Sequence, residues 1–472
     1  MASELPVGET RFGDLIDGNE ATPQIRVQIR RTDATHVELI VPWASDSSEE
    51  PYRRWFSGNT ISFDDDPDRS LYRYSVPPVL LFQDHHGPVV LVGCSSLGYT
   101  ESWMLGSGAG RARVRHAVFG GRSLEYAKVN GMRTEVSGLH SWLDIHSISE
   151  DRPDHSSGVY TVRAAAPVEI DGIEGLSFVP VDSVRPGGEG ERILRESVHV
   201  QTLRAEPVRW AEHWKMHLAI RDLVATASWR PERFTAATVS RDDDPLRVAS
   251  GDAVGRAWHD VVAAGVDASG DTPPRRHADF LFRSRDLPEG AIAQWIRLRE
   301  QYARAVDPII SGLRLDQGAV ESAFAQVGIG MEALGYQLAL RTGTPAKADK
   351  RTFAQRLELV AADLPLVMPF DVETWVRETT AAYNGIKHAN RALPAAVQVL
   401  NRTRECQLMF RAWIAYKLGM DLPGLQRAVD ADPMVHAYEA LPDPADDSVP
   451  HAEPRTTAPT LLQRESRREE PE

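Results

Sequence analysis

Short runs of alternating apolar and polar residues fill the first two hundred positions, and this is the pattern of β-strands with one buried face. Turn residues separate the runs, which lie at 24–30, 36–41, 72–76, 88–93, 111–118, 159–163 and 197–201. Short strands at this spacing predict an antiparallel sandwich or a barrel-like sheet. A helix is expected over about 207–229, and a second strand region over about 235–285 that closes with the apolar run at 278–283. Residues 1–285 therefore form one predicted β-rich module.

Near Gly290 the apolar spacing changes to the 3.6-residue period of amphipathic helices. This change predicts a helical connector at 290–316, followed by an all-α bundle at 317–420. The predicted fold class is therefore α+β and multidomain. The segment 441–472 is rich in Pro, Asp, Glu and Arg, which predicts a disordered acidic tail. Prolines lie between the expected bundle helices, where helices should stop, and these helices are placed at 320–340, 352–362, 372–388 and 395–417.

Length and composition describe a soluble globular protein of two or three domains, with 472 residues and 42% apolar content. No apolar run is long enough for a membrane helix, and the N-terminal residues do not resemble a signal peptide, so we expect no membrane contact. The two cysteines, Cys94 and Cys406, are too few for a cysteine metal site and too far apart in the chain to indicate a disulfide framework. We therefore expect a cytoplasmic protein.

Charge is unevenly distributed along this acidic chain, whose formal net charge is −14. The predicted bundle at 317–420 has a net charge of +3, whereas the segment from Asp421 to the end has −7 and the remaining residues have −10. A positive bundle permits contact with RNA, although dedicated nucleic-acid binders carry a much stronger basic stripe.

The strongest candidate site lies in the segment Tyr383-Asn384-Gly385-Ile386-Lys387-His388. On a helix, Asn384 and His388 share one face because they are four residues apart. Lys387 is adjacent, and Arg391 is one turn further if the helix continues that far. Such a set suits metal-free RNA cleavage, since an imidazole moves protons, an amide orients it and a cation offsets charge on the phosphate. The alternative is a helix end that carries polar residues by chance.

This segment resembles the signature of HEPN domains, which are small helical bundles found in many prokaryotic toxins and anti-phage nucleases. The signature is an arginine, a polar residue, about three further residues and a histidine, and 384–388 fits its second part. Residues 330–335, with Glu332, resemble the acidic segment of the first HEPN helix. Residues 137–143 resemble a glycine–leucine–tryptophan strand of the ApeA N-terminal domain. The whole chain is similar to the ApeA type, in which a β-rich domain precedes a HEPN bundle.

The resemblance implies an abortive-infection effector whose N-terminal module senses a phage-derived trigger and whose bundle cleaves RNA as a homodimer. No cofactor or metal is needed, because a ribose 2′-hydroxyl attacks the adjacent phosphate. His388 would act as the acid/base group, Asn384 would orient it, and Arg391 with Lys387 would stabilise the phosphorane. Glu332 would be a supporting carboxylate that pairs with an arginine or histidine of 383–391, or else a partly exposed surface residue.

One position departs from the signature, because Tyr383 stands where an arginine is expected. Arg377 would lie on the same face as His388, but about 16 Å away along the helix axis. Arg377, Lys387 and Tyr383 are the candidate RNA-contacting residues, with Tyr383 stacking on a base or bonding to a phosphate. Either the arginine role has moved, or a dimer partner supplies it, or catalysis is lost and the protein is an RNA- or nucleotide-binding regulator.

Other features leave further alternatives open. Asp84-His85-His86 is similar to a manganese phosphoesterase signature but fits a hairpin turn better. His213 and His217, one helical turn apart, could share a zinc ion in a metal-dependent hydrolase, although a structural role is the better interpretation. A set of apolar bundle residues offers surface either to a dimer partner or to the N-terminal module, and it consists of Trp375, Ile386, Met409, Phe410 and Trp413.

Overall fold

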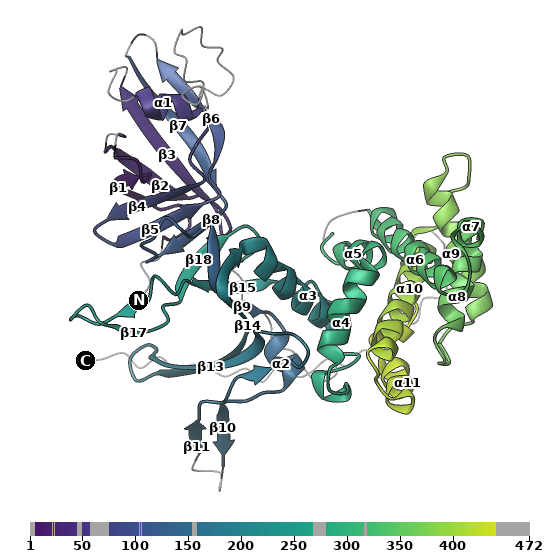
Figure 1. The fold of residues 1–472 in the computed structure, drawn as a ribbon. Coiled ribbons are helices and arrows are strands. Elements are labelled where there is room, and N and C mark those ends of the chain that lie inside the picture. The colour runs from purple at the N-terminus through teal and green to yellow at the C-terminus, as the bar shows by residue number, and fades with distance from the viewer. Residues whose placement is uncertain are drawn as a thin grey trace, which may run out of the picture.

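The computed structural model has a β-rich N-terminal half and a helical C-terminal part, which confirms the predicted fold class. Figure 1 shows helix α3 (Trp210–Ser228) between the strands and the C-terminal helices. Residues 441–472, the predicted tail, lie outside the described part of the chain. Within the described part, no helix is both long and apolar enough to cross a membrane. The structure describes residues 5–20, 22, 24–44, 50–56, 75–102, 104, 106–152, 158–267, 280–315 and 319–439.

Fourteen strands form one open sheet, in which every pair of neighbours is antiparallel. Its order is β12-β13-β14-β9-β15-β18-β8-β5-β4-β1-β2-β3-β7-β6, and β10-β11 and β16-β17 form two small separate sheets. The strands are β1 Thr10–Ile16, β2 Arg26–Arg31, β3 Val37–Ala44, β4 Val79–Asp84, β5 Gly87–Val92, β6 Ser95–Ser102, β7 Ser107–Val114, β8 His116–Phe119, β9 Lys128–Val136, β10 Ile148–Asp151, β11 Val159–Val162, β12 Val168–Glu169, β13 Leu176–Pro186, β14 Arg192–Arg209, β15 Phe234–Ser240, β16 Leu246–Arg247, β17 Ala253–Gly255 and β18 His259–Ala263.

The helical part begins after a short 3-10 turn, η4. The helix α8 starts with a capping box, in which the side chains of Thr352 and Gln355 each bond to the other's backbone N–H. Asp371 and Asp421 cap the two helices that follow them in the same way, through their carboxylates. The helices other than α3 are α1 Glu50–Phe56, α2 Leu139–Leu143, η4 Ser284–Asp286, α4 Ala291–Gln301, α5 Ala303–Gly312, α6 Val320–Thr342, α7 Pro345–Asp349, α8 Phe353–Ala362, α9 Val372–Lys387, α10 Ala396–Lys417, α11 Leu422–Ala431 and η5 Pro433–Val435.

Two hydrophobic cores lie against the sheet. The smaller core fills the N-terminal strands and is closed by α1, where the Phe56 ring stacks on Trp43 at 5.9 Å between centroids. Gly110 permits this contact, since a Cβ there would lie 2.1 Å from the Phe56 ring. The larger core begins at β9 and β14, surrounds α3 and continues without interruption into the C-terminal helices. The module and the bundle therefore share one core.

Most of the apolar bundle residues that were predicted to offer a surface are buried inside the protein. Trp375, Met409, Phe410 and Trp413 are fully buried. The Phe410 ring packs against Trp229, directly after α3, at a centroid distance of 6.4 Å. The N-terminal module therefore covers Phe410, whereas Trp375 packs against Phe370 and Trp413 against Tyr302 within the helical part.

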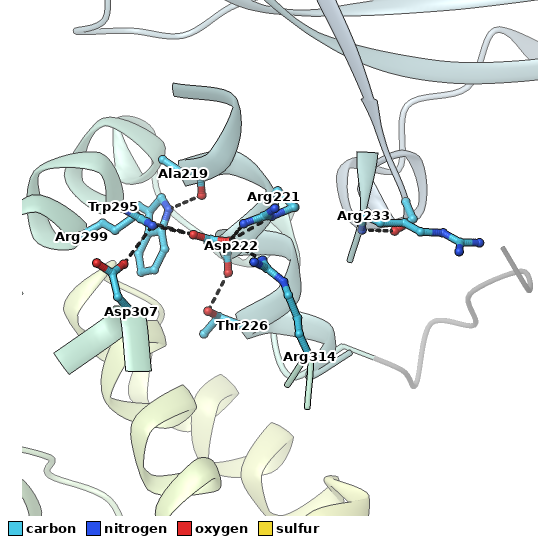
Figure 2. A network of polar contacts seen from close by, with 10 residues as sticks. Ala219, Arg221, Asp222, Thr226, Arg233, Trp295, Arg299, Asp307 and Arg314 are labelled. Carbon is cyan, nitrogen blue, oxygen red and sulfur yellow. Dashed lines mark hydrogen bonds and ion pairs between the residues drawn. The ribbon is translucent and has the colours of Figure 1, made fainter. Parts of the chain in front are cut away.

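An ionic network around Asp222 joins α3 to the helices that follow it, as Figure 2 shows. The Asp222 carboxylate is buried and accepts hydrogen bonds from Arg299 of α4 at 2.7 Å and from Arg314, beyond α5, at 3.3 Å. Its neighbour Arg221 donates a third bond at 2.8 Å. Each charge in this partly dry site has a partner, as burial requires.

Helix α6 lies at the centre of the bundle because three glycines allow its neighbours to approach closely. A Cβ at Gly328 would lie 2.5 Å from the Tyr383 ring of α9, one at Gly330 would lie 2.6 Å from a carbonyl of α5, and one at Gly335 would lie 2.5 Å from the Arg356 carbonyl of α8. The glycines therefore set the positions of α5, α8 and α9 around α6.

The structure corrects several predicted elements. Residues 137–143 form a turn followed by the short helix α2 rather than a strand, and the predicted strand at 111–118 is divided between β7 and β8. In place of the predicted sandwich or barrel, the strands form a single open sheet. Residues 280–283 are not a strand but an irregular segment with buried side chains, and the helical part extends past residue 420 through α11. Of the expected strand at 72–76, only 75 and 76 are described, and they are not in a strand.

Candidate active site

The candidate site lies at the C-terminal end of α9, which ends at Lys387. His388 follows with an extended backbone, and its N–H donates to the Asn384 carbonyl at 3.0 Å. The helix therefore does not continue as far as Arg391, which was the condition for placing Arg391 one helical turn beyond His388. A turn holds Arg391 close to the imidazole-bearing residue instead, since its N–H donates to the His388 carbonyl at 2.9 Å.

The chain folds back over the end of α9 at Gly385. A Cβ at this position would lie 2.5 Å from the Ala392 carbonyl oxygen and 3.1 Å from the Pro394 ring. Pro394 has no N–H and α10 starts two residues later, so the connection is short and its path is fixed by the contact at Gly385. This contact positions the turn that carries His388 and Arg391.

The polar groups of the turn are open to solvent. Lys387, His388, Asn390 and Arg391 are exposed, and Asn384 is half-buried. Within the described residues, no carboxylate forms an ion pair with Lys387, His388 or Arg391. Two cations and an imidazole are therefore available to an anionic ligand such as a phosphate.

Tyr383 does not face solvent, which corrects its predicted role. Its side chain is 6% exposed and packs against Phe353 of α8 at a centroid distance of 4.6 Å. Its hydroxyl donates to Glu332 at 3.3 Å. Burial, together with the charge of Glu332, raises the pKa of Tyr383 to about 12, so the hydroxyl remains a donor at neutral pH. A buried ring cannot stack on a base, and Tyr383 instead anchors α9 to the bundle.

Glu332 has a different main partner from the one expected. Arg356 of α8 forms an ion pair with it at 2.7 Å, whereas no arginine or histidine of 383–391 does so. Lys387 lies over the Tyr383 ring, with its Nζ 5.4 Å from the centroid. Contacts therefore run from Arg356 through Glu332 and Tyr383 to the edge of the exposed cluster. Sequence reasoning missed Arg356, because only the close crossing of α6 and α8 brings it to Glu332.

Arg377 is separate from this cluster. It lies in the exposed middle of α9, where it donates to Thr374 at 3.3 Å and pairs with Glu378 at 3.5 Å. Helix α9 runs from Val372 to Lys387, directly before His388. At the helical rise per residue, Arg377 is therefore about 16 Å from His388 along the axis, as expected.

The two other histidine motifs have structural roles. His217 of α3 is fully buried, and both of its ring nitrogens lie at hydrogen-bond distance from threonine hydroxyls, with Thr134 at 2.7 Å and Thr202 at 2.9 Å. Burial lowers the pKa of His217 to about 3. His213 likewise contacts Thr202 and the Val129 carbonyl, so the structural interpretation of this pair is confirmed.

In the motif at 84–86, Asp84 ends β4 and His85 and His86 form the two-residue turn of the β4–β5 hairpin, as predicted. Asp84 accepts from Arg11 at 2.8 Å and from the His86 N–H at 2.8 Å, so its carboxylate serves the hairpin. Among the described residues, neither this motif nor the pair in α3 belongs to a group of three or more metal-ligating side chains.

Comparison with known proteins gives one positive result. A family model described as ApeA N-terminal domain 1 matches residues 57–295, from just after α1 to the middle of α4. No curated protein and no solved structure matches the chain. The matched residues make up slightly more than half of the sequence, and the chain therefore belongs to the ApeA family, whose N-terminal domain indicates a role in defence against phages.

Proposed function

We propose that the protein is an abortive-infection effector whose helical part is a metal-independent endoribonuclease of the HEPN type. The observation that carries this proposal is the exposed cluster at the end of α9. There His388 lies between Lys387 and Arg391 in the sequence, all three are exposed, and neither cation has a carboxylate partner among the described residues.

The roles of the residues follow from their positions. His388 is the acid/base group, because an exposed imidazole can both accept and donate a proton. Arg391 and Lys387 offset the charge of the phosphorane formed when a 2′-hydroxyl attacks the adjacent phosphate. Asn384 is one turn earlier, and its carbonyl already holds the His388 N–H. The ion pair of Arg356 with Glu332 supports this end of the helix from behind.

A second copy of the chain completes the site in this proposal. The cluster forms an open surface, and one copy provides only one side of a cleft for RNA. Leu393, in the same turn, is 66% exposed, and exposed apolar side chains beside a polar cluster are typical of protein interfaces. We expect two copies to meet at the ends of their α9 helices, with the N-terminal module restraining activity until it binds a phage-derived trigger.

Cleavage of RNA in EDTA tests the proposal. Purified protein should cut a mixed single-stranded RNA without added metal, and His388→Ala should abolish cutting. Arg391→Ala should lower the rate on the order of 10²- to 10³-fold. His436→Ala and Arg427→Ala remove exposed residues elsewhere in the helical part and are the matched controls. Cutting that requires added metal, or that persists without His388, would contradict the proposal.

A second candidate function is an RNA-binding regulator without catalysis. The buried Tyr383 favours it, since no arginine occupies the position that the HEPN signature requires. Such a protein would retain RNA in a filter-binding assay, lose binding in Arg391→Ala, and cut nothing. RNA binding by the dimeric wild-type protein without any RNA cleavage would therefore favour this candidate.

A further inference from the structure

A cluster of two histidines and a glutamate lies in the N-terminal module, apart from the candidate active site. His140 is in α2, His146 follows that helix, and Glu196 is in β14. The Glu196 Oε1 atom lies 3.2 Å from His140 Nε2 and 2.9 Å from His146 Nδ1. One ligand atom from each residue lies within 4.8 Å of the others. Ligands around a tetrahedral zinc ion, at about 2.0–2.1 Å from the metal, are about 3.3 Å apart. The cluster therefore matches the size of such a site.

The second polar atoms of His146 and Glu196 are held by neighbours, as in known metal sites. His146 Nε2 lies 3.4 Å from Asp144 Oδ1, which would form a carboxylate–histidine–metal arrangement. Glu196 Oε2 accepts the N–H groups of Ser147 at 2.8 Å and Ile148 at 2.9 Å, which leaves Oε1 directed at the histidines.

One atom in the cluster lacks the partner that burial normally requires. His140 Nε2 is buried and makes no hydrogen bond, although it lies within ion-pair distance of Glu196. Buried polar atoms without a partner are uncommon and require an explanation. A bound cation would satisfy this nitrogen.

We propose that His140 Nε2, His146 Nδ1 and Glu196 Oε1 bind a zinc ion, with the fourth position open to solvent or to a small ligand. Two imidazoles and a carboxylate favour zinc over magnesium or calcium, which prefer oxygen ligands alone. The open position faces outward, since the His146 side chain is 54% exposed.

The ion would join three segments of the module, and through Asp144 it would be linked to η4, which precedes the C-terminal helices. It would tie α2 and the segment after it to β14. Asp144, which orients His146, also accepts from Arg285 of η4 at 3.0 Å, immediately before α4. Occupation of the site would therefore stabilise the junction between the module and the helices.

Zinc titration of the full-length protein tests this inference. The protein is treated with EDTA, freed of chelator, and titrated against a chromophoric zinc indicator. We expect one equivalent of tight zinc binding, weakened at least ~10-fold by His140→Ala, His146→Ala or Glu196→Gln. Glu196→Gln keeps an acceptor for the Ser147 and Ile148 N–H groups, so it removes the charge with little effect on the fold.

Two controls make the result decisive. His36→Ala removes a histidine that pairs with Asp33 in the other half of the sheet, and it should bind zinc as the wild type does. Circular dichroism verifies that each variant is folded, and zinc should raise the melting temperature of the wild type but not of folded Glu196→Gln. Absence of stoichiometric zinc binding by the wild type, or a zinc affinity in all three cluster variants equal to that of the wild type, would show that the residues form ordinary ion pairs and would overturn the inference.

Discussion

Two residues behind the candidate site, Tyr383 and Glu332, decide how the end of α9 is held. The hydroxyl of Tyr383 and the guanidinium of Arg356 share the Glu332 carboxylate. Arg356 therefore acts on the end of α9 through Glu332 and Tyr383. The buried Tyr383 ring is part of the packing between α8 and α9.

We predict that Tyr383→Phe lowers stability but not RNA binding. The ring keeps its contact with Phe353, while the hydrogen bond to Glu332 is lost, at a cost of about 1 kcal/mol. Urea unfolding gives the free energy, and filter binding gives the affinity for RNA. A loss of RNA affinity with unchanged stability would show that the hydroxyl contacts the ligand after all.

Glu405 of α10 gives a prediction about pH. Burial raises the pKa of Glu405 from 4.5 to about 7, despite ion pairs with Arg402 at 3.0 Å and Arg404 at 3.5 Å. Because the folded-state pKa lies above the unfolded value, the folded protein binds the extra proton, and the free energy of unfolding falls as pH rises from about 4.5 through 7.

Glu405→Gln should remove this part of the pH dependence. We expect its melting temperature to equal or exceed that of the wild type at pH 8 and to gain no such advantage at pH 5, as measured by calorimetry at both values. If the melting temperature falls between pH 5 and pH 8 by the same amount in the wild type and in Glu405→Gln, Glu405 is excluded as the titrating group.

At the scale of elements, the turn after α9 depends on the contact between Gly385 and Ala392. Gly385→Ala places a methyl group where the Ala392 carbonyl lies, so the turn must move and carry His388 with it. We predict lower stability, by about 1–3 kcal/mol, and loss of most RNA cleavage. Gly312→Ala is the control, because a Cβ there meets its nearest neighbour at 3.7 Å. Equal stability and equal RNA cleavage in Gly385→Ala and Gly312→Ala would contradict the proposed function of the turn.

Long helices were predictable from the sequence, whereas the arrangement of strands was not. The helices α6, α8, α9 and α10 lie within about two residues of their predicted bounds, because each combines a clear 3.6-residue period with a proline or polar stop. The helix α2 has five residues, which is too short to show a period. Strand order depends on pairings between distant segments, such as β9 with β14, and nothing in either strand alone specifies its partner.

The candidate site was predictable only in part for the same reason. His388, Lys387 and Arg391 are neighbours in sequence, so spacing alone could bring them together. Arg356 is joined to the site through α6, and the cluster of His140, His146 and Glu196 combines α2 with a strand about fifty residues later. Spacing within a single helix or strand carries no signal for contacts of this kind.

At the scale of the whole molecule, α3 connects the sheet to the helices. One side of it packs on β9 and β14, and its C-terminal carbonyl groups at Thr226 and Ala227 accept bonds from Arg411 of α10 at 3.0 and 2.9 Å. With the Asp222 network, these contacts make the module and the bundle one cooperative unit. Helix α3 therefore links the sheet directly to the C-terminal helices.

We predict that Asp222→Ala destabilises both parts together. The substitution leaves Arg221, Arg299 and Arg314 without their shared partner, and loss of one member of a buried ion pair costs about 3–5 kcal/mol. Asp307→Ala, which removes an exposed partner of Arg299, should cost less than about 1 kcal/mol. Calorimetry should show one transition at a lower temperature for Asp222→Ala. Two separate transitions, with one unchanged from the wild type, would contradict a shared core.

The central claim, cleavage by a ribose 2′-hydroxyl assisted by His388, is tested most directly by comparing two substrates of one sequence in EDTA. The first is RNA, and the second carries 2′-O-methyl groups throughout and so has no nucleophile. We predict that the wild type and His436→Ala cut only the RNA and leave 2′,3′-cyclic phosphate ends, and that His388→Ala cuts neither substrate. Cutting of the methylated strand, or equal cutting of RNA by His388→Ala, would contradict the account.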